Sequence, residues 1–240
     1  MKKQSKIHLF FFFILFFLST SCSLKNNVCK DGKGEIINQE RSISAFTAIE
    51  SRGNFTINLF QDSSIKEQSV IISAQENIIE LIQTEIFGQS LIINNNECYN
   101  TDEEIRITIQ TPALSQIVLN GSGNIILQDT VRNNEIEFVL DGSGKIQTTP
   151  DFPIIATTKC ITRVKGSGNI DLDFKATSII NASVDGSGSI ILRGKALENN
   201  LSINGSGTIK AFALPILKNT SEIIGSGIIE LTAVDTINTI

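Results

Sequence analysis

The chain has 240 residues, a formal net charge of −5 at pH 7 and a single histidine, His8. This composition, without a basic cluster or a stripe of aromatic and basic residues, is not that of a nucleic-acid-binding protein. We expect His8 to be removed with an export signal, and a mature chain without histidine can hold neither a histidine-dependent catalytic triad nor a histidine-ligated zinc site.

Residues 1–21 are laid out like a bacterial signal peptide. Lys2 and Lys3 precede an apolar run, residues 8–18, which is too short to cross a bilayer as a helix. Small residues then lead into Cys22, an arrangement that resembles the lipobox of bacterial lipoproteins, although Ser19 stands where leucine is usual. We therefore expect a lipid on Cys22 that anchors an exported protein in the outer membrane, on either its periplasmic or its outer side. The alternative is an ordinary signal peptide followed by an incidental cysteine.

Residues 22–42 are polar and rich in glycine, lysine and asparagine, so we expect a tether between the anchor and a single solenoid domain. Residues 43–120 are expected to form irregular N-terminal β-helix coils. Apolar residues alternate there with a period of two, which predicts six strands, at 45–50, 55–60, 69–73, 90–94, 104–110 and 116–119.

Two places in this N-terminal part allow more than one interpretation. Gly53 fits a degenerate turn in which Arg52 takes the position of a serine. Residues 75–87 fit either a brief helical turn, which we favour, or a strand with a bulge.

Residues 121–240, expected to form the regular coils, contain a Gly-Ser-Gly turn six times, at intervals of 19 to 24 residues. A repeat with this period is typical of a solenoid, in which each repeat has too little apolar surface to form a core alone and the coils must stack. The glycines of the six turns are Gly121, Gly123, Gly142, Gly144, Gly166, Gly168, Gly186, Gly188, Gly205, Gly207, Gly225 and Gly227.

The residues beside each turn indicate which kind of solenoid forms. An isoleucine stands two places after each second glycine and an aliphatic residue two places before each first glycine, as Ile190 and Val184 do around residues 186–188. This period of two is that of a strand that enters the turn and a strand that leaves it. Glycine suits both corners because it accepts positive φ and lets a neighbouring coil approach closely.

The sequence therefore predicts an all-β fold, a single-stranded parallel β-helix with Gly-Ser-Gly turns and about 20 residues per coil. Six isoleucines should form an inner ladder and six serines an outer one. Coils with two faces and coils with three faces both fit the pattern.

Three stretches of the chain resemble a known family. They are Phe-Thr-Ala-Ile-Glu-Ser-Arg-Gly-Asn-Phe-Thr-Ile-Asn-Leu at residues 46–59, Thr-Pro-Ala-Leu at residues 111–114 ahead of the first complete turn, and the later Gly-Ser-Gly turns. Together they resemble the putative auto-transporter adhesin head domain, or GIN domain, over most of the mature chain. The resemblance implies a β-helix related in shape to pectin lyases but without their catalytic residues, on exported Gram-negative proteins that serve in adhesion. Arg52 departs from the small residue usual at its position.

Two acidic groups deserve consideration as catalytic or metal-binding sites. Asp171 and Asp173 share an outward face and could act as acid and base on a sugar, but exposed carboxylates on a strand more often serve solubility. Asp102, Glu103 and Glu104 could hold a metal ion, but a solvated loop is the simpler interpretation. We therefore predict no catalytic residue, no metal and no cofactor.

Three cysteines follow Cys22. Cys29 and Cys98 lie in polar stretches of an exported protein and either pair as a disulfide or stay free. Cys160 falls in the inward phase of its strand, which predicts a buried, inert thiol.

These patterns favour a non-enzymatic cell-envelope lipoprotein whose flat sides bind a glycan or a surface protein, through residues that the sequence does not identify. A polysaccharide-binding or polysaccharide-degrading β-helix is the first alternative. A structural envelope protein that stacks end to end as a homo-oligomer is the second. A degrading enzyme would need carboxylates and basic residues along one cleft, whereas the charges of the regular coils do not recur in register.

Overall fold

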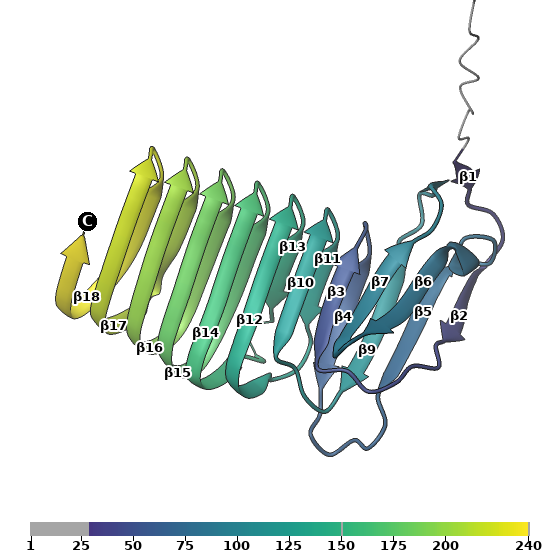
Figure 1. Cartoon of the computed structure of the whole chain (residues 1–240), viewed down its shortest axis with the longest axis horizontal. Coiled ribbons are helices and arrows are strands. Elements are labelled where there is room, and N and C mark those ends of the chain that lie inside the picture. Colours follow the sequence, from purple (N-terminus) through teal and green to yellow (C-terminus); the bar gives the residue numbers. More distant parts are fainter. Residues whose placement is uncertain (1–28, 150, 240) are drawn as a thin grey trace, which may run out of the picture.

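The computed structural model describes residues 29–149 and 151–239. The expected signal peptide, residues 1–21, and the expected lipid attachment site, Cys22, lie outside these residues. Within the described part, no helix has the length and apolar character needed to cross a membrane. The described residues form a solenoid whose strands stack side by side along the longest axis of the molecule (Figure 1).

The regular coils pair in parallel from one turn of the solenoid to the next, about 21 residues apart. The predicted parallel β-helix is thereby confirmed. The strands are β10 (Gln116–Gly121), β11 (Asn124–Leu127), β12 (Arg132–Gly142), β13 (Lys145–Thr148), β14 (Ile154–Gly166), β15 (Asn169–Gly186), β16 (Ser189–Gly205), β17 (Thr208–Gly225) and β18 (Ile228–Thr239).

The Gly-Ser-Gly turns lie above one another along one edge of the solenoid. Gly142 pairs with Gly121 on one side and with Gly166 on the other, and the same register continues to the last turn. The carbonyl oxygen of Gly142 accepts hydrogen bonds from the backbone N–H groups of Ser167 and Gly168, at 3.0 and 2.9 Å. Neighbouring turns are therefore joined through their backbones, which leaves no room for a side chain between them.

The isoleucines after the turns form the predicted inner column. Five of them are fully buried, and each pairs with its counterpart in the next coil: Ile125, Ile146, Ile170, Ile190 and Ile209. Ile229, in the outermost described coil, is half-buried. The column also extends to Ile57 and Ile107 in the N-terminal coils. Burial of each such side chain contributes about 1.5–3 kcal/mol to folding.

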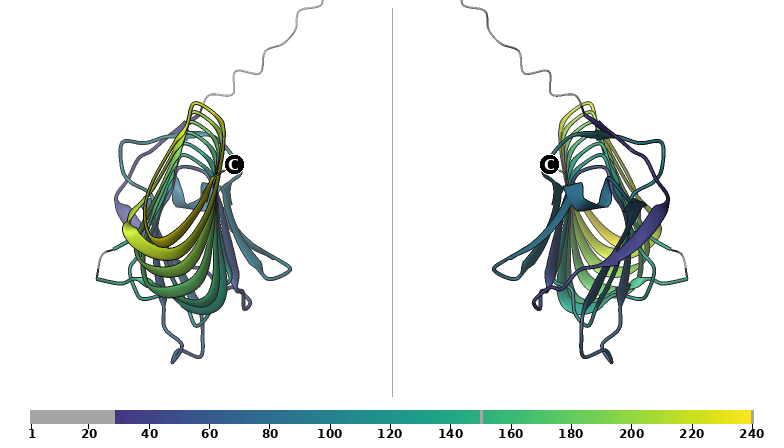
Figure 2. Two further views of the ribbon diagram at one scale, coloured as in Figure 1. Left: turned by 90° about the vertical axis from the view of Figure 1, so that its left-hand side faces the viewer. Right: turned by 90° about the vertical axis from the view of Figure 1, so that its right-hand side faces the viewer.

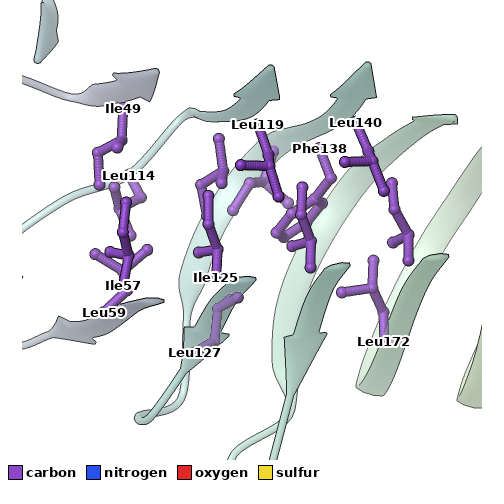
Figure 3. Close-up of a cluster of buried hydrophobic side chains, with 14 of the residues drawn as sticks. Ile49, Ile57, Leu59, Leu114, Leu119, Ile125, Leu127, Phe138, Leu140 and Leu172 are labelled. Atoms are coloured by element: carbon purple, nitrogen blue, oxygen red, sulfur yellow. The ribbon is translucent and has the colours of Figure 1, made fainter. Parts of the chain in front are cut away.

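The core is one continuous cluster that runs through all the coils. Figure 3 shows part of it, where Leu119 and Ile125 of one coil lie beside Phe138 and Leu140 of the next. Viewed end on, each coil has two long sides, joined by a narrow corner at one edge and by a rounded bend at the other (Figure 2). The coils therefore have two faces. Register shifts between neighbouring coils fall in the rounded bend, for example between Phe174 and Thr177.

The N-terminal part contains all six predicted strands, together with four further strands and one 3-10 turn. Residues 75–87 combine the two expected structures, since the 3-10 turn is followed directly by a strand. The elements are β1 (Lys30–Asp31), β2 (Ile36–Glu40), β3 (Ala48–Arg52), β4 (Thr56–Gln61), β5 (Ser69–Gln75), η1 (Ile79–Leu81), β6 (Ile82–Phe87), β7 (Ser90–Asn95), β8 (Tyr99–Asn100) and β9 (Arg106–Thr111).

The stacking order of these strands departs from their order in the chain. β3 and β4 lie between β10 and β11 on one side and β7 and β9 on the other. Beyond them, β6 pairs with β7, β5 with β9 and β2 with β5, all antiparallel. Residues 43–120 are therefore not a simple run of successive coils. A short turn at Gly88, with φ of +63°, joins β6 to β7, and strands joined so tightly must run antiparallel.

The segment expected to be a tether, residues 22–42, belongs to the fold from residue 29 onward. Cys29 forms a disulfide with Cys98, β1 pairs with β8, and β2 pairs with β5. The segment is ordered because β2 supplies backbone partners to β5, which would otherwise be an open edge of the sheet.

The turn at Gly53 has a different register from the expected one. Arg52 pairs with Asn120, the residue before the first complete turn, which places Gly53 at the first-glycine position and Phe55 at the second. Asn54, rather than Arg52, is thus the counterpart of the serine. Phe55 is 1% exposed, so at this position the ring of a buried phenylalanine takes the place of the second glycine of the later turns.

Candidate binding surface

The edge formed by the Gly-Ser-Gly turns carries the predicted outer ladder of serines. All six are exposed: Ser122, Ser143, Ser167, Ser187, Ser206 and Ser226. In the later turns, their backbone N–H groups donate hydrogen bonds to carbonyl oxygens of the preceding coil. Ser187, for example, donates to the carbonyl oxygen of Gly166 at 2.9 Å. The narrow edge thus holds the coils together and offers a partner little more than a row of hydroxyl groups.

Asp171 and Asp173, the possible acid–base pair, are both held by Arg193 of the next coil. The Nε atom of Arg193 lies 2.9 Å from Oδ1 of Asp173, and its Nη2 atom pairs with Asp171. Hydrogen bonds to Asp173 and then to Asp171 raise the pKa of Arg193 against the opposing effect of burial. Since both carboxylates are paired with one guanidinium, the cluster connects two coils and does not have the free pair that sugar hydrolysis requires.

The acidic loop lies beside the disulfide at the N-terminal end of the solenoid. Asp102, Glu103 and Glu104 line a cleft of about 720 Å³ together with Tyr99. Hydrogen bonds from Thr56 and Arg106 lower the pKa of Glu104. Over residues 29–149 and 151–239, no group of three or more His, Cys, Asp or Glu side chains has a geometry suited to a metal ion.

A second cleft, of about 840 Å³, opens where the segment before β3 crosses the loop before β5. Gln68, which lines it, donates to the carbonyl oxygen of Phe46 at 2.7 Å and accepts from its N–H at 2.8 Å. These bonds fix the crossing of two connecting segments, which is a structural role.

The cysteines occupy two different environments. Cys29 and Cys98 are joined as a disulfide, with their Cα atoms 4.7 Å apart and a sequence separation of 69. Cys160 is a free thiol and fully buried, and burial raises its pKa far above the ordinary value. A thiol that cannot ionise near neutral pH is a poor nucleophile, so Cys160 is part of the core.

The side of the solenoid formed by the strands that lead into the turns carries a shallow groove of about 350 Å³. It runs across β14, β15, β16 and β17. We call it the amide groove, after the two asparagines at its centre. Its main lining residues are Asn181, Ser183, Asn200, Ser202, Thr220 and Glu222.

The amide groove is hollow because short side chains stand in register between longer ones. Asn181 pairs with Asn200, and Asn200 with Thr220, in one column of the sheet. Lys159 and Arg163 close the groove at its β14 end. All of these side chains point outward, since the residues that alternate with them are buried.

The charges at the β14 end of the amide groove are largely balanced. Lys159 lies 3.2 Å from Glu135 of the neighbouring coil, and Arg163 forms an ion pair with Glu137. At the other end Glu222 is exposed. The centre is therefore uncharged, with the amides of Asn181 and Asn200 beside the apolar side chain of Ile161, and it is bounded by groups of both signs.

These residues were not predicted from the sequence, although a signal was present. Asn-x-Ser followed by an aliphatic residue occurs at 181–184 and again at 200–203, in the same position relative to the turn. The pattern repeats in register, as the charged residues do not. The sequence does not show that the two asparagines are neighbours in space. The register of β15 and β16 shows this.

Comparison with solved structures supports the same fold. A putative adhesin from Parabacteroides merdae ATCC 43184 has a TM-score of 0.75 at 20% identity, covering 88% of this chain and 98% of the other. A putative lipid binding protein from Parabacteroides distasonis ATCC 8503 has a TM-score of 0.73 at 24% identity, with the same coverage. A putative adhesin from Bacteroides fragilis NCTC 9343 has a TM-score of 0.68 at 20% identity, covering 88% and 99%.

The comparison with curated proteins gave no match. The family model described as "Putative auto-transporter adhesin, head GIN domain" matches residues 45–240, which include every coil of the solenoid. The structure has the repeated turns and the parallel register that the resemblance implied. The chain therefore belongs to the family of the auto-transporter adhesin head, or GIN, domains.

Proposed function

We propose that the protein is a non-enzymatic, exported lipoprotein of the cell envelope that binds a partner on another surface through a flat side of its solenoid. The observation that carries the proposal is the wide outer face of the parallel sheet, on which side chains from successive coils stand in register. Such a face presents a long, rigid array of groups, which is suited to an extended partner. The family and the structural neighbours, described as putative adhesins and in one case as a putative lipid binding protein, support a binding function.

The proposed anchor complements this arrangement. Cys29, where the disulfide begins the fold, follows Cys22 by seven positions in the chain. A fully extended chain of that length spans about 25 Å at most. A lipid on Cys22 would therefore keep the N-terminal end of the solenoid close to the membrane, with the remaining coils available to a partner.

The alternative of a polysaccharide-degrading enzyme has less support from the described residues. The acidic pair on the regular coils, Asp171 and Asp173, is held in ion pairs with Arg193. The acidic cleft at the N-terminal end holds Glu104 in an ion pair with Arg106. The first place has no free pair of carboxylates, and in the second Asp102 and Glu103 are consecutive residues of one loop, whereas hydrolysis needs carboxylates that flank the glycosidic bond.

The proposal is tested by adhesion of cells. Cells that carry the protein, and otherwise identical cells that lack it, are applied to surfaces coated with polysaccharides or with extracellular proteins. We expect the protein to increase adhesion to at least one surface, and we expect the purified chain to release no reducing ends from the polysaccharides. Equal adhesion by both kinds of cell would contradict the binding function, and release of reducing ends would favour an enzyme.

A further inference from the structure

We propose that the amide groove is a binding site for an extended, neutral polysaccharide that crosses the strands along the axis of the solenoid. The inference rests on the proposed binding function and assigns it a place and a class of ligand. The groove extends over four neighbouring strands, from Lys159 and Arg163 on β14 to Glu222 on β17.

The polar groups of the groove match the hydroxyl groups of a sugar. Asn200 donates through Nδ2 to Oδ1 of Asn181 at 2.9 Å, a bond that fixes both amides at the groove's centre. This bond uses one donor and one acceptor, and each amide has further hydrogen-bonding capacity. Ser183, Ser202 and Thr220 add hydroxyl groups that can donate or accept. Sugar hydroxyls likewise act in both senses, so a surface of amides and hydroxyls can satisfy them.

The spacing of these groups suits a periodic ligand. Successive strands of a sheet lie about 4.8 Å apart, and the column of Asn181, Asn200 and Thr220 therefore presents a polar group at each such interval. An extended chain of β-linked sugars advances by a similar distance with each ring. One sugar can thus lie over each coil, in contact with the same kind of side chain each time.

The same features disfavour other classes of partner. No aromatic side chain lines the groove, and Arg163 is engaged with Glu137, so the usual anchors of a protein interface are not available there. A nucleic acid would need unpaired positive charge. Lys159 is also shared with a glutamate, Glu135, and Glu222 adds a negative charge at the far end. A neutral polysaccharide fits this balance better than an acidic one.

The experiment uses the full chain in detergent solution, with xylan, mannan, β-glucan and polygalacturonate immobilised as probes. The test variant is Asn181→Ala combined with Asn200→Ala. The matched control is Asn169→Ala combined with Ser189→Ala, because Ser189 and Asn169 form a similar hydrogen bond, at 2.7 Å, on the opposite side of the same two coils. Melting curves of all variants show whether each has folded.

We expect at least one neutral polysaccharide to bind, and the groove variant to bind it about tenfold more weakly, while the control binds like the original chain. Polygalacturonate should bind less well than the neutral chains. A second variant, Ser202→Trp, fills the groove without removing an asparagine and should also prevent binding, whereas Ser189→Trp on the other side should not.

The possible failures can be told apart. Polysaccharide binding that the groove variants leave unchanged would overturn the site but not the binding function. Adhesion of cells to protein-coated surfaces without any polysaccharide binding would overturn the class of ligand. Preference for polygalacturonate would overturn the choice of a neutral chain, and loss of adhesion to every surface would overturn the proposed function together with the site.

Discussion

At Gly186 the backbone has a φ of +122°, and a Cβ atom there would lie 2.6 Å from the carbonyl oxygen of Gly166 in the preceding coil. The positive φ disfavours any L-residue with a side chain, and the short distance would make a Cβ atom clash with backbone that cannot move aside. The carbonyl oxygen of Gly166 also accepts two hydrogen bonds from the turn that contains Gly186. One residue type thus serves conformation, packing and hydrogen bonding together.

We expect Gly186→Val to lower the free energy of unfolding by about 2–5 kcal/mol, because backbone strain and overpacking act together. The measurement is the midpoint of urea denaturation, followed by circular dichroism. Ser187→Ala, one residue along on the exposed side of the same turn, is the control and should change the midpoint little. An unchanged midpoint for the valine variant would mean that the turn does not have the described geometry.

Whether a side chain points inward or outward could be predicted from the sequence where the pattern repeats and where one face of the strand is buried. The positions of the isoleucines relative to the turns placed them inside, and five of them are fully buried. Asn181 and Asn200 could be assigned to the outer face by the same alternation. That they touch, and that they lie in a hollow, depends on side chains from four strands at once.

Among the elements, the strands of the N-terminal part were predictable but their direction was not. A period of two shows which side chains are inward, and it is the same for a parallel and an antiparallel strand. β5 therefore looked like part of a further coil, whereas it runs antiparallel to β9. β6 lies in the stretch where a brief helical turn was favoured, and it runs antiparallel to β7. The direction of β6 relative to β7 was decided by the short connection at Gly88, which has no room for a coil.

The disulfide between Cys29 and Cys98 attaches the first described strands to the rest of the fold. β1 and β2 have few buried side chains of their own, and Ile36 and Ile37 on β2 are 49% and 40% exposed. β1 and β2 are therefore kept in place by the backbone pairing of β2 with β5 and by the covalent link near β1. Such a link stabilises a fold mainly by restricting the unfolded chain.

We expect Cys29→Ser combined with Cys98→Ser to make the backbone amides of residues 30–40 exchange with solvent at least about tenfold faster, because local opening then meets less resistance. Hydrogen exchange measured by mass spectrometry would show this. The control is Cys160→Ala, which leaves the disulfide intact. The role of the disulfide would be refuted by equal protection of this segment with and without the two cysteines, after non-reducing electrophoresis had shown that the bond forms in the original chain.

At the scale of the whole molecule, the solenoid has an antiparallel cap at its N-terminal end, where the proposed anchor would lie. In Figure 1 the first described strand, β1, lies at one end of the long axis and the last strand, β18, lies at the other. An anchor at Cys22 would thus leave most of the flat side with the amide groove away from the membrane. The position of the groove, on β14 to β17, is compatible with a partner on a facing surface.

We expect Cys22→Ala to release the exported protein from the membrane fraction into the soluble fraction, since no other lipid attachment is proposed. Fractionation and immunoblotting would measure this, with Ser23→Ala as the neighbouring control. Retention of the Cys22→Ala protein in the membrane, to the same extent as the original, would argue against the lipid anchor.

The sequence by itself was sufficient to determine the repeat, the parallel β-helix and the inner and outer faces of its coils, because glycine turns and alternation are local patterns that recur along the chain. The tertiary structure alone decided that β3 and β4 stack between β10–β11 and β7–β9, that residues 29–42 are folded, and that Asn181 and Asn200 share a groove. These features depend on which segments become neighbours in space. That choice follows from chain connections and from the pairing of whole strands, neither of which leaves a periodic mark in the sequence.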